Sequence, residues 1–530
     1  MAGLSTFDLR SDPPIINIPR RYNAAVDFID RNLVEGREAN SAVIDGDGSY
    51  SYGELAQRVN RCGNALTGLG LRREDRVALL LPDTIDFPVA FWGCIKAGIV
   101  PIPLNTLLTT RDYLYILEDS RAGTLIISAA LLERILPVRD QLPGLQHIIV
   151  SGEGAALPSL AVLMQAADTN LEAAPTTRDD IAFWLYSSGS TGTPKGVLHC
   201  HSHLIQTAVR YGLGILKMRE QDVVFSAAKL FFAYGLGNGM SFPFLVGATS
   251  ILLAQRPTPA LVLDTLQRRR PTVFFGVPSL YAALLAQPDL WPAPGSLRLR
   301  ACVSAGEALP EDIGNKCQQY FGAPVLDGIG STELLHIFIS NRLDEVHYGS
   351  TGKPVPGYRV KLVNEQDHAV GVSEIGELVV SGPSAAVAYW NQRDKSLHTF
   401  RGAWTYTGDK YTVDRDGYYH YCGRTDDMLK VGGQWVSPFE VEATLIQHES
   451  VQEAAVVGRQ DEHHLVKPKA YVVLKPGVES SAKLAVEIQE FVKSRIAMHK
   501  YPRWIEFIDS LPKTATGKIQ RFKLRNEKEV

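Results

Sequence analysis

The sequence predicts an α/β protein with a large N-terminal domain of parallel-type sheets layered with helices, a small β-rich subdomain, and a smaller mobile α+β C-terminal domain. Three observations support this. Helix-like and strand-like segments alternate through the first half, short strands separated by turn residues follow from about Gly349, and a second αβ pattern follows a polar stretch at residues 423–427. We therefore expect one domain over residues 1–425 and a second over residues 426–530.

The first domain begins with a well-marked pattern. Residues 51–69 fit an amphipathic helix, because Leu55, Val59, Cys62, Leu66 and Leu69 recur on one side. The other expected elements are strands at 76–81, 123–127, 223–228 and 273–277 and helices at 88–98 and 258–269, with subdomain strands at 360–363, 376–381 and 418–421. This alternation indicates βαβ units and a largely parallel sheet.

Composition excludes several classes of protein. Apolar residues make up 45% and charged residues 21% of the 530 residues, and the net charge of -3 gives no global field for nucleic acid or an acidic membrane. The six cysteines form no CxxC pair, which indicates reduced thiols in a cytoplasmic protein. The uncharged window 236–254 is long enough to span a membrane, but its glycines, asparagine and proline favour a buried helix followed by a strand.

A loop rich in Gly, Ser and Thr follows the apolar residues 181–185 and ends in Pro-Lys-Gly. Glycines let backbone N–H groups approach phosphates, hydroxyls donate further bonds, and a lysine adds positive charge. The spacing is not that of a Walker motif. A flexible linker is the alternative, but apolar segments flank the loop. The predicted polyphosphate-binding residues are Ser187, Ser188, Gly189, Ser190, Thr191, Gly192 and Lys195.

Five further motifs follow in order. They are Ser-Ala-Gly-Glu at 304–307, Gly-Ile-Gly-Ser-Thr-Glu at 328–333, Thr-Gly-Asp at 407–409 with Gly-Arg-Thr-Asp-Asp at 423–427, and Pro-Lys-Thr-Ala-Thr-Gly-Lys-Ile at 512–519. With the phosphate loop, they resemble the acyl-adenylate-forming superfamily of acyl-CoA synthetases, peptide-synthetase adenylation domains and luciferases. The resemblance covers nearly the whole chain and implies ATP, Mg²⁺ and coenzyme A as cofactors and co-substrates. It makes residues 1–425 the AMP-binding, acyl-adenylating domain and residues 426–530 the domain that carries the catalytic lysine.

The resemblance also implies roles for single residues. Lys518 would stabilise charge in the adenylation step, Thr332 would bond a phosphate oxygen, Glu333 would ligate Mg²⁺, and Asp426 would be the hinge between an adenylating and a thioester-forming arrangement. The nucleotide contacts would be Gly306, Glu307, Asp327, Gly328 and Ile329 near the adenine and Asp409 and Arg424 at the ribose. Ile329 stands near the family's aromatic position, which puts ring stacking there in doubt.

Coenzyme A would contact the C-terminal domain. Residues 431–436 would line the pantetheine tunnel, where Gly432 and Gly433 permit close backbone approach. Lys467 and Lys469 could meet the phosphates of coenzyme A or form a solvated pair. Each ionic candidate has a structural alternative: a turn or capping aspartate for Asp409, a surface glutamate for Glu333, a surface ion pair for Arg424.

A cluster of His199, Cys200, His201 and His203 has the residue types of a metal site. No carboxylate or second cysteine pair supports it, so we expect no zinc there.

The expected acid is aromatic. The segment from Phe232 and the residues after the Thr-Glu pair offer flat aromatic walls with few charges, which suit a planar ring. The predicted substrate contacts are Phe232, Ala233, Tyr234, Gly235, Gly330, His336 and Ile337. These segments look most like benzoate–CoA ligases, but the aromatics could be plain core.

Other functions remain open. Hydroxybenzoate, aminobenzoate, cinnamate-type acids and fatty acids are alternative substrates. An adenylation domain that serves a carrier protein is an alternative function, and a catalytically inactive binding or luciferase-like protein is another. We expect small-molecule partners, no nucleic acid or membrane, and a possible homodimer.

Overall fold

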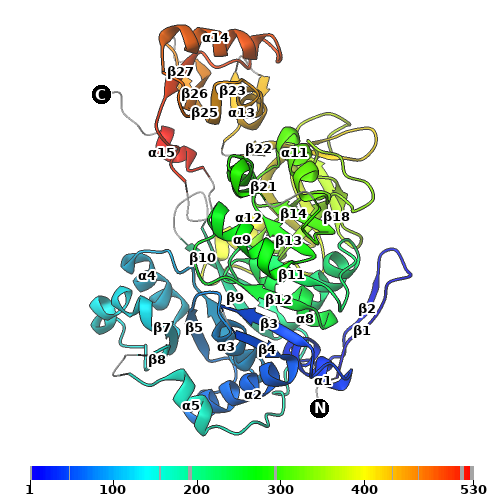
Figure 1. The fold of residues 1–530 in the computed structure, drawn as a ribbon, viewed down its shortest axis with the longest axis vertical. Coiled ribbons are helices and arrows are strands. Elements are labelled where there is room, and N and C mark those ends of the chain that lie inside the picture. The colour runs from blue at the N-terminus through cyan, green and yellow to red at the C-terminus, as the bar shows by residue number, and fades with distance from the viewer. Residues whose placement is uncertain are drawn as a thin grey trace. The chain divides into compact units, whose positions relative to one another are not determined.

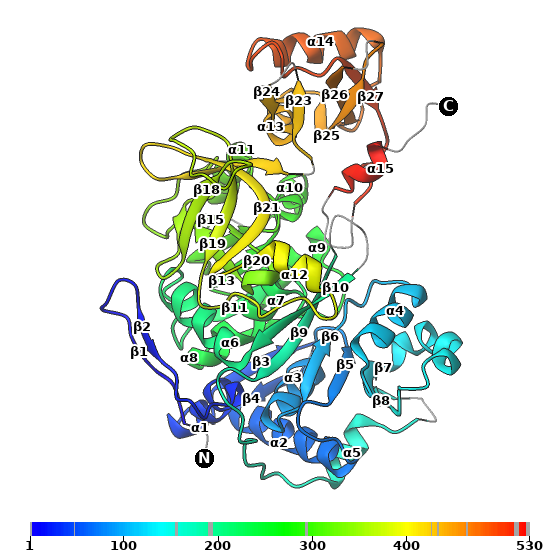
Figure 2. The same ribbon diagram turned by 180° about the vertical axis from the view of Figure 1, so that it is seen from behind.

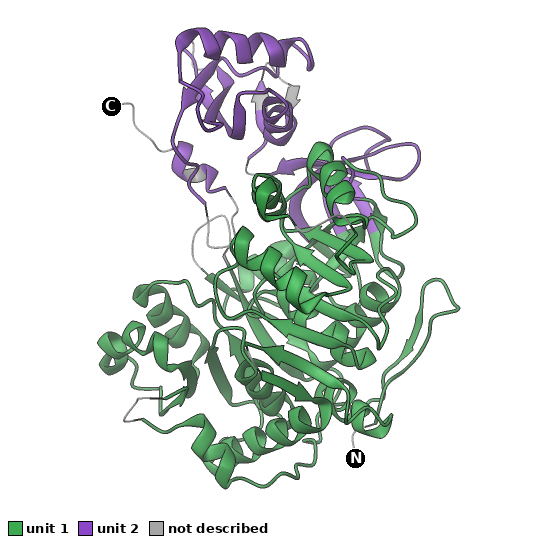
Figure 3. Cartoon of the chain, in the orientation of Figure 1, with its two compact units in different colours: residues 1–348, 352–359, 380–405 green, residues 349–351, 360–379, 406–530 purple. Residues whose placement is uncertain are grey.

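The computed structural model describes residues 3–46, 48–153, 157–188, 194–291, 295–425, 427–431, 434–462, 465–513 and 519–525. Two compact units divide the chain (Figure 3). Unit 1 comprises residues 1–348, 352–359 and 380–405, and unit 2 comprises residues 349–351, 360–379 and 406–530.

A nine-stranded sheet forms the centre of unit 1 (Figure 1). Its order is β17-β16-β15-β14-β13-β11-β12-β3-β4, and β15 through β3 run parallel, while the edge strands β17, β16 and β4 pair antiparallel. The strands are β3 (Ser41–Asp45), β4 (Gly48–Ser51), β11 (Val223–Ser226), β12 (Thr249–Leu252), β13 (Val273–Gly276), β14 (Ala301–Ala305), β15 (Val325–Gly330), β16 (Ile337–Ser340) and β17 (Lys353–Pro354).

Helices cover both faces of this sheet. On one face, α9 (Pro259–Arg269), α10 (Pro278–Leu285) and α11 (Glu311–Phe321) share a buried core with Phe225, Phe274 and Cys302 of the strands. On the other face, the Ser250 hydroxyl donates to the Gly239 carbonyl at 2.7 Å. Gly239 lies in η5 (Gly237–Ser241), a π-helical turn between α7 (Ala233–Leu236) and α8 (Phe242–Val246). Alternate strand residues thus face opposite layers.

A second, wholly parallel sheet has the order β6-β5-β7-β8. Its elements are β5 (Arg76–Leu80), β6 (Val100–Pro103), β7 (Thr124–Ser128), β8 (His147–Ser151), α2 (Tyr52–Gly68), α3 (Asp86–Lys96) and α4 (Thr110–Ser120). Helix α2 begins after Ser51, whose side chain accepts from the Glu54 N–H while Glu54 bonds back to the Ser51 N–H. This capping box fixes the start of the helix.

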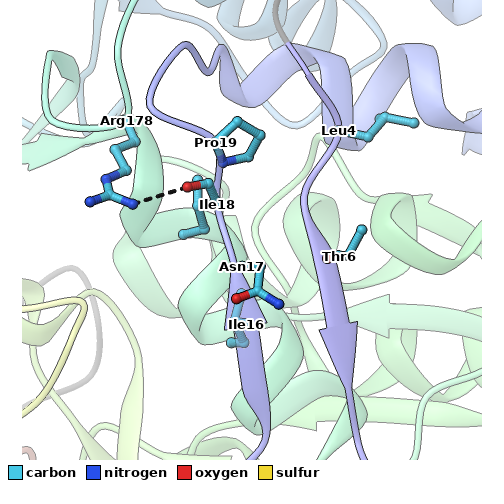
Figure 4. A pocket seen from close by; sticks show the side chains of 7 residues that line it. All are labelled: Leu4, Thr6, Ile16, Asn17, Ile18, Pro19 and Arg178. Atoms are coloured by element: carbon cyan, nitrogen blue, oxygen red, sulfur yellow. Dashed lines mark hydrogen bonds between the residues drawn. The ribbon is translucent and has the colours of Figure 1, made fainter.

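Unit 1 also contains two hairpins. β9 (Ile181–Ser188) pairs antiparallel with β10 (Pro194–Cys200), and β1 (Thr6–Asp8) pairs with β2 (Ile15–Asn17) in an arm near the N-terminus (Figure 2). A hollow beside that arm is bounded by Arg178, whose guanidinium donates to the Ile18 carbonyl at 3.0 Å (Figure 4). No predicted site residue lines it. The remaining elements are η1 (Val26–Asp30), α1 (Arg31–Val34), η2 (Ala129–Arg134), η3 (Leu136–Gln141), α5 (Leu160–Ala166), α6 (His201–Thr207), η4 (Ala208–Leu213), η6 (Pro288–Leu290), η7 (Thr332–Leu334), α12 (Arg393–Thr399) and β20 (Phe400–Arg401).

Unit 2 begins with short strands. A five-stranded sheet has the order β18-β19-β21-β20 with β22 beside β21, and unit 2 contains β22 and most of β18, β19 and β21. These strands are β18 (Arg359–Val363), β19 (Gly376–Ser381), β21 (Trp404–Val413) and β22 (Tyr419–Arg424). The C-terminal part packs α13 and α14 against a three-stranded sheet, β25-β26-β27. Its elements are β23 (Leu429–Val431), β24 (Gln434–Val436), α13 (Pro438–Ile446), β25 (Val451–Gln460), β26 (Val466–Leu474), α14 (Ala482–Lys493), β27 (Trp504–Phe507) and α15 (Arg521–Arg525).

The predicted fold class is confirmed, with mostly parallel sheets and helices in the large N-terminal part and a smaller α/β C-terminal part. The window 236–254 forms η5, α8 and β12, which is a buried helical segment followed by a strand. Among the described residues, no helix combines the length and apolarity needed to cross a bilayer. The domain boundary at 425/426 stays a prediction, because the two compact units divide the chain differently.

Candidate active site

Hairpin β9–β10 carries the predicted phosphate-binding lysine. Lys195 lies opposite Ser187 in the antiparallel register, and Ser188 lies opposite Pro194. The Ser187 hydroxyl is buried and has no hydrogen-bond partner among the described residues. A buried hydroxyl beside a lysine suits an anion such as a phosphate. The predicted contacts Gly189, Ser190, Thr191 and Gly192 lie outside the described residues.

Glu333, the predicted Mg²⁺ ligand, lies beside this lysine. The Lys195 ammonium is 3.7 Å from Glu333 Oε1, and the two side chains are only 15% and 16% exposed. The Tyr389 hydroxyl donates to the same Oε1 at 2.8 Å, and the Lys195 ammonium lies 4.2 Å from the centre of the Tyr389 ring. Three segments far apart in sequence therefore meet at one carboxylate.

The turn that carries Glu333 is held at its backbone. Ser331 caps η7 by accepting from the Leu334 N–H at 3.3 Å. His199 Nε2 lies 2.8 Å from the Thr332 carbonyl, and burial lowers the pKa of His199 to about 4. A carbonyl only accepts, so a neutral His199 donates from Nε2. This contact fixes the backbone of Thr332, the predicted phosphate contact.

The histidine cluster has hydrogen-bonding roles. His199 Nδ1 and His203 Nδ1 are 3.1 Å apart, and His201 Nδ1 accepts from the Ala24 N–H at 3.0 Å. Cys200 Sγ donates to the Asp179 carbonyl at 3.2 Å. In the part of the chain that the structure describes, no group of three or more His, Cys, Asp or Glu side chains could hold a metal ion. All six cysteines are buried and unpaired.

The chemistry around Glu333 fits a hydrated magnesium ion. Mg²⁺ is commonly bound by one or two carboxylates together with waters and substrate phosphates. Glu333 supplies one carboxylate, and the positive charge of Lys195 beside it favours anionic ligands such as phosphates. The residues present therefore fit Mg²⁺ delivered with ATP.

The predicted adenine-side residues lie directly after β14 and within β15. Gly306 has a φ of +98°, which favours glycine, and Glu307 follows it. On β15, Asp327 is 4% exposed, its Oδ1 has no hydrogen-bond partner among the described residues, and burial raises its pKa well above the usual range. Gly328 and Ile329 continue β15. The strand leads from this buried carboxyl toward its carboxyl end at Gly330, and open α/β sheets bind ligands beyond such strand ends.

The predicted acid-binding residues form an aromatic cluster. The rings of Tyr234 and His336 are 5.6 Å apart, and the Tyr234 hydroxyl bonds the carbonyls of Gly276 and Val303, each at 3.2 Å. The single hydroxyl proton is shared between the two carbonyls, and this bifurcated hydrogen bond ties the ring to β13 and β14. His336 is 2% exposed, and burial lowers its pKa to about 3, so it is neutral. The Tyr234 and His336 rings therefore form a rigid, uncharged aromatic cluster.

Glycines let neighbouring backbone segments approach closely around this aromatic cluster. A Cβ on Gly330 would lie 2.7 Å from the His336 backbone, and a Cβ on Gly235 would clash with the Lys229 carbonyl. Phe232 precedes α7, Ala233 is its first residue, and Ile337 is 1% exposed. The structure therefore brings these predicted contacts to neighbouring positions around Tyr234 and His336.

In unit 2, the predicted ribose-binding residues form a pair. Asp409 and Arg424 lie opposite each other on β21 and β22, and the Arg424 guanidinium donates to Asp409 Oδ1 at 3.1 Å and to the Thr407 carbonyl at 2.9 Å. Gly408 has a φ of +72°, and a Cβ there would lie 2.8 Å from Arg424 Nη2. The glycine lets the guanidinium reach the carboxylate.

Other predicted residues lie outside the described part or have further partners. Asp426, Gly432, Gly433 and Lys518 are not among the described residues. Lys469 lies 2.7 Å from Glu506 Oε2, and this pairing raises its pKa despite partial burial. Lys467 lies opposite Arg459 in the register of β25 and β26.

Sequence reasoning missed three contact residues. Tyr389 bonds Glu333, His199 bonds the Thr332 carbonyl, and Asn238 Oδ1 accepts from His336 Nε2 at 3.0 Å. Tyr389 belongs to no motif that the sequence analysis used, and Asn238 stands in the segment predicted to line the acid site but was not selected as a contact. His199 was considered only as a possible metal ligand. Each acts through a partner distant in sequence, so spacing alone gives no signal.

Comparisons with known proteins agree with this geometry. Residues 31–390 match the AMP-binding enzyme family, and residues 440–518 match the AMP-binding enzyme C-terminal domain. A benzoate–CoA ligase of Thauera aromatica is 58% identical over 99% of this chain and 100% of its own length.

Two solved structures are similar to this chain. A benzoate CoA ligase from Burkholderia xenovorans LB400 has a TM-score of 0.90 and 51% identity, over 95% of this chain and 100% of its own. The anthranilate CoA ligase AuaEII in complex with anthranoyl-AMP has a TM-score of 0.91 and 45% identity, over 96% and 97%. The superfamily resemblance is confirmed: the chain belongs to the AMP-binding enzyme family.

Proposed function

We propose that this chain activates benzoate, or a close aromatic analogue, with ATP and transfers the acyl group to coenzyme A. The observation that carries the proposal is the meeting of Lys195 and Glu333, two residues from separate motifs, at one largely buried place beside the unpartnered Ser187 hydroxyl. Such a place suits a magnesium–polyphosphate group. The similarity to a benzoate–CoA ligase and to an anthranilate CoA ligase supports the choice of acid.

In the first step, a carboxylate oxygen of the acid attacks the α-phosphorus, and the bond to pyrophosphate breaks. Lys195 and Ser187 would bond the leaving phosphates, Asp409 and Arg424 would hold the ribose, and Lys518 would offset the repulsion between the two anions. Mg²⁺ held by Glu333 would supply positive charge at the phosphates.

In the second step, the sulfur of coenzyme A attacks the acyl carbon, and the bond to AMP breaks as the thiol proton is lost. Residues 431–436, with Gly432 and Gly433, would line the path of the pantetheine arm after rotation of the C-terminal domain about Asp426. Hinges of this kind absorb large backbone changes over few residues.

The aromatic cluster supports an aromatic acid. Neutral His336 and the anchored Tyr234 ring present flat, uncharged surfaces, which suit a benzene ring better than a second charged group. Close analogues remain candidates, because one hydroxyl or methylene changes discrimination only modestly in an apolar pocket.

An acid panel tests the proposal. The full chain is incubated with ATP, Mg²⁺ and benzoate, 4-hydroxybenzoate, 2-aminobenzoate, cinnamate or hexanoate, with and without coenzyme A. We expect pyrophosphate exchange and a benzoyl-CoA product, with benzoate or a ring-substituted benzoate giving the highest kcat/KM. Exchange without any thioester would instead indicate an adenylation domain for a carrier protein. No exchange with any acid would refute the proposal.

Lys518→Ala tests the assignment of the catalytic lysine. We expect the loss of acyl-AMP formation, while the transfer of a supplied benzoyl-AMP to coenzyme A is retained. Formation of acyl-AMP at the wild-type rate would remove Lys518 from the first step.

Location and assembly are part of the proposal. Six buried, unpaired cysteines are consistent with a reducing cytoplasm, and a homodimer is the assembly expected from the family resemblance. Light scattering of the purified chain tests the second point.

A further inference from the structure

The phenol of Tyr389 contacts the glutamate of the candidate phosphate site. The Tyr389 hydroxyl donates to Glu333 Oε1 at 2.8 Å, and Tyr389 is only 4% exposed. The Lys195 ammonium also approaches Oε1, at 3.7 Å. Both contacts fall on the same carboxylate oxygen, so the contacts given by the described residues orient the group with Oε2 directed to another cation.

The segment that carries Tyr389 is bonded to both partners. Next to β10, the N–H groups of Val387 and Trp390 donate to the carbonyls of Leu198 and Gly196, at 3.0 and 2.8 Å. At its other end, the Ala386 N–H donates to the Glu333 carbonyl at 2.7 Å. The segment 386–390 therefore links the strand of Lys195 to the turn of Glu333.

Packing fixes the phenol itself. The Tyr389 ring lies 5.2 Å from the Phe400 ring, and the Tyr389 N–H donates to the Ser396 hydroxyl at 3.0 Å. A ring held in this way loses little further freedom when it donates its hydrogen bond. A glutamate side chain alone would sample several rotamers.

We infer that Tyr389 is a positioning residue that presents Glu333 to the magnesium ion of the ATP complex. The inference rests on the proposed function. The phenol hydrogen bond selects one rotamer of Glu333 and fixes Oε1, so the metal meets a carboxylate already in place. Outer partners of metal ligands typically change metal affinity by about 10- to 100-fold when they are removed.

Tyr389→Phe removes only the hydroxyl and tests the inference in the full chain. ATP binding is measured by calorimetry without Mg²⁺ and across a Mg²⁺ titration. Without Mg²⁺ we expect an unchanged ATP affinity. The Mg²⁺ concentration that gives half of the maximal enhancement of ATP binding should rise about tenfold. Pyrophosphate exchange should recover at saturating Mg²⁺. An unchanged Mg²⁺ dependence would overturn the inference.

Tyr52→Phe is the matched control. Tyr52 is also buried, and its hydroxyl donates to the Ala248 carbonyl at 2.6 Å, away from Glu333. We expect the wild-type Mg²⁺ dependence. A similar shift in Tyr52→Phe would show that the effect of Tyr389→Phe comes from a general loosening of unit 1. That result would overturn the inference.

A double-mutant cycle separates positioning from stability. If Tyr389 acts through Glu333, Tyr389→Phe in a Glu333→Gln background adds nothing to the Mg²⁺ dependence. Additive losses would show an independent structural role. Tyr389→His, whose imidazole can donate at a similar place, should fall between wild type and Tyr389→Phe, and it is the second variant if the first one unfolds. Wild-type pyrophosphate exchange reports on the proposed function separately.

Discussion

The proposed phosphate-binding residues of unit 1 and the proposed ribose-binding residues of unit 2, called here the phosphate part and the ribose part, are built in opposite ways. In unit 1, the phosphate part joins residues distant in sequence, since Tyr389 and Glu333 are 56 positions apart and His199 and Thr332 are 133 apart. In unit 2, the ribose part is local, since Asp409 and Arg424 are 15 positions apart on adjacent strands. A local pair forms whenever its hairpin forms, whereas the phosphate part needs the whole unit to fold.

The exposure of the two cations differs in the same direction. Lys195 is 15% exposed and Arg424 is 41% exposed, whereas the carboxylates Glu333 and Asp409 are similar, at 16% and 13%. Charges that are removed from water interact more strongly than charges at a wetter surface. We therefore expect substitutions in the phosphate part to cost more than substitutions in the ribose part.

Glu333→Gln should have the largest effect. The loss of the proposed metal ligand is expected to lower kcat for benzoate-dependent pyrophosphate exchange by about 10²- to 10³-fold, the range for removal of a preorganised charge partner. Initial rates at saturating ATP measure it. Glu311→Gln, an exposed carboxylate at the start of α11, is the control and should keep wild-type activity. A Glu333→Gln enzyme with normal kcat would contradict the role of this carboxylate.

Asp409→Asn should come next. The amide keeps the shape of the side chain but loses the charge, and a hydrogen bond to a charged group contributes about 1.5–3 kcal/mol. We expect KM for ATP to rise about 10- to 100-fold with a smaller change in kcat. Asp414→Asn, on the same hairpin and 3.0 Å from His420, controls for a general change of charge. A loss confined to kcat would argue against ribose binding by Asp409.

The contrast between local and distant contacts also explains what the sequence could predict. Helix α2 was predicted at 51–69 and spans Tyr52–Gly68, because its apolar period and its Ser51 cap are both local. Asp409 and Arg424 were each selected as ribose contacts because both stand in recognisable motifs, but their contact with each other was not predicted. The fold class followed from the alternation of elements.

Tyr389 could not be predicted in this way. Its function depends on the position of segment 386–390 beside β10, which only the folded unit creates. His199 was interpreted by residue type, although its partner is a carbonyl that carries no sequence signal. Predictions about Lys518 and Asp426 rest on motif resemblance alone.

Gly408→Ala tests how tightly the ribose part is packed. The added Cβ would lie 2.8 Å from Arg424 Nη2 and would push the guanidinium away from Asp409. We expect KM for ATP to rise about three- to tenfold, which corresponds to a loss of up to about 1.4 kcal/mol.

Gly417→Ala is the matched control for that variant. Gly417 also has a positive φ, of +82°, but no atom lies within 4 Å of the new Cβ. It carries the same backbone strain without touching Arg424, so its stability should fall by a similar amount while KM for ATP stays unchanged. Equal KM values for the two variants would show that the guanidinium does not depend on Gly408.

The smallest effect concerns a buried histidine of unit 1. His201 of unit 1 is 2% exposed, and burial lowers its pKa from 6.5 to about 4, whereas His420 on the ribose hairpin is 41% exposed. His201 Nδ1 accepts from the Ala24 N–H, so protonation there breaks that bond. Between pH 6.5 and 4 the unfolded chain binds more protons at this position than the folded chain, so stability falls as the pH falls.

His201→Asn should reduce this pH dependence, because the amide oxygen can still accept from Ala24 but does not titrate. Between pH 7.5 and 5.5 we expect the free energy of unfolding of wild type to fall by about 1 kcal/mol more than that of the variant. The cause is the proton that the unfolded chain binds at His201 and the folded chain does not. Denaturant unfolding at the two pH values measures the difference, with the exposed His368→Gln as the control. An equal fall in all three proteins would mean that His201 is not held neutral by burial, and the contrast between the two parts would then be one of packing alone.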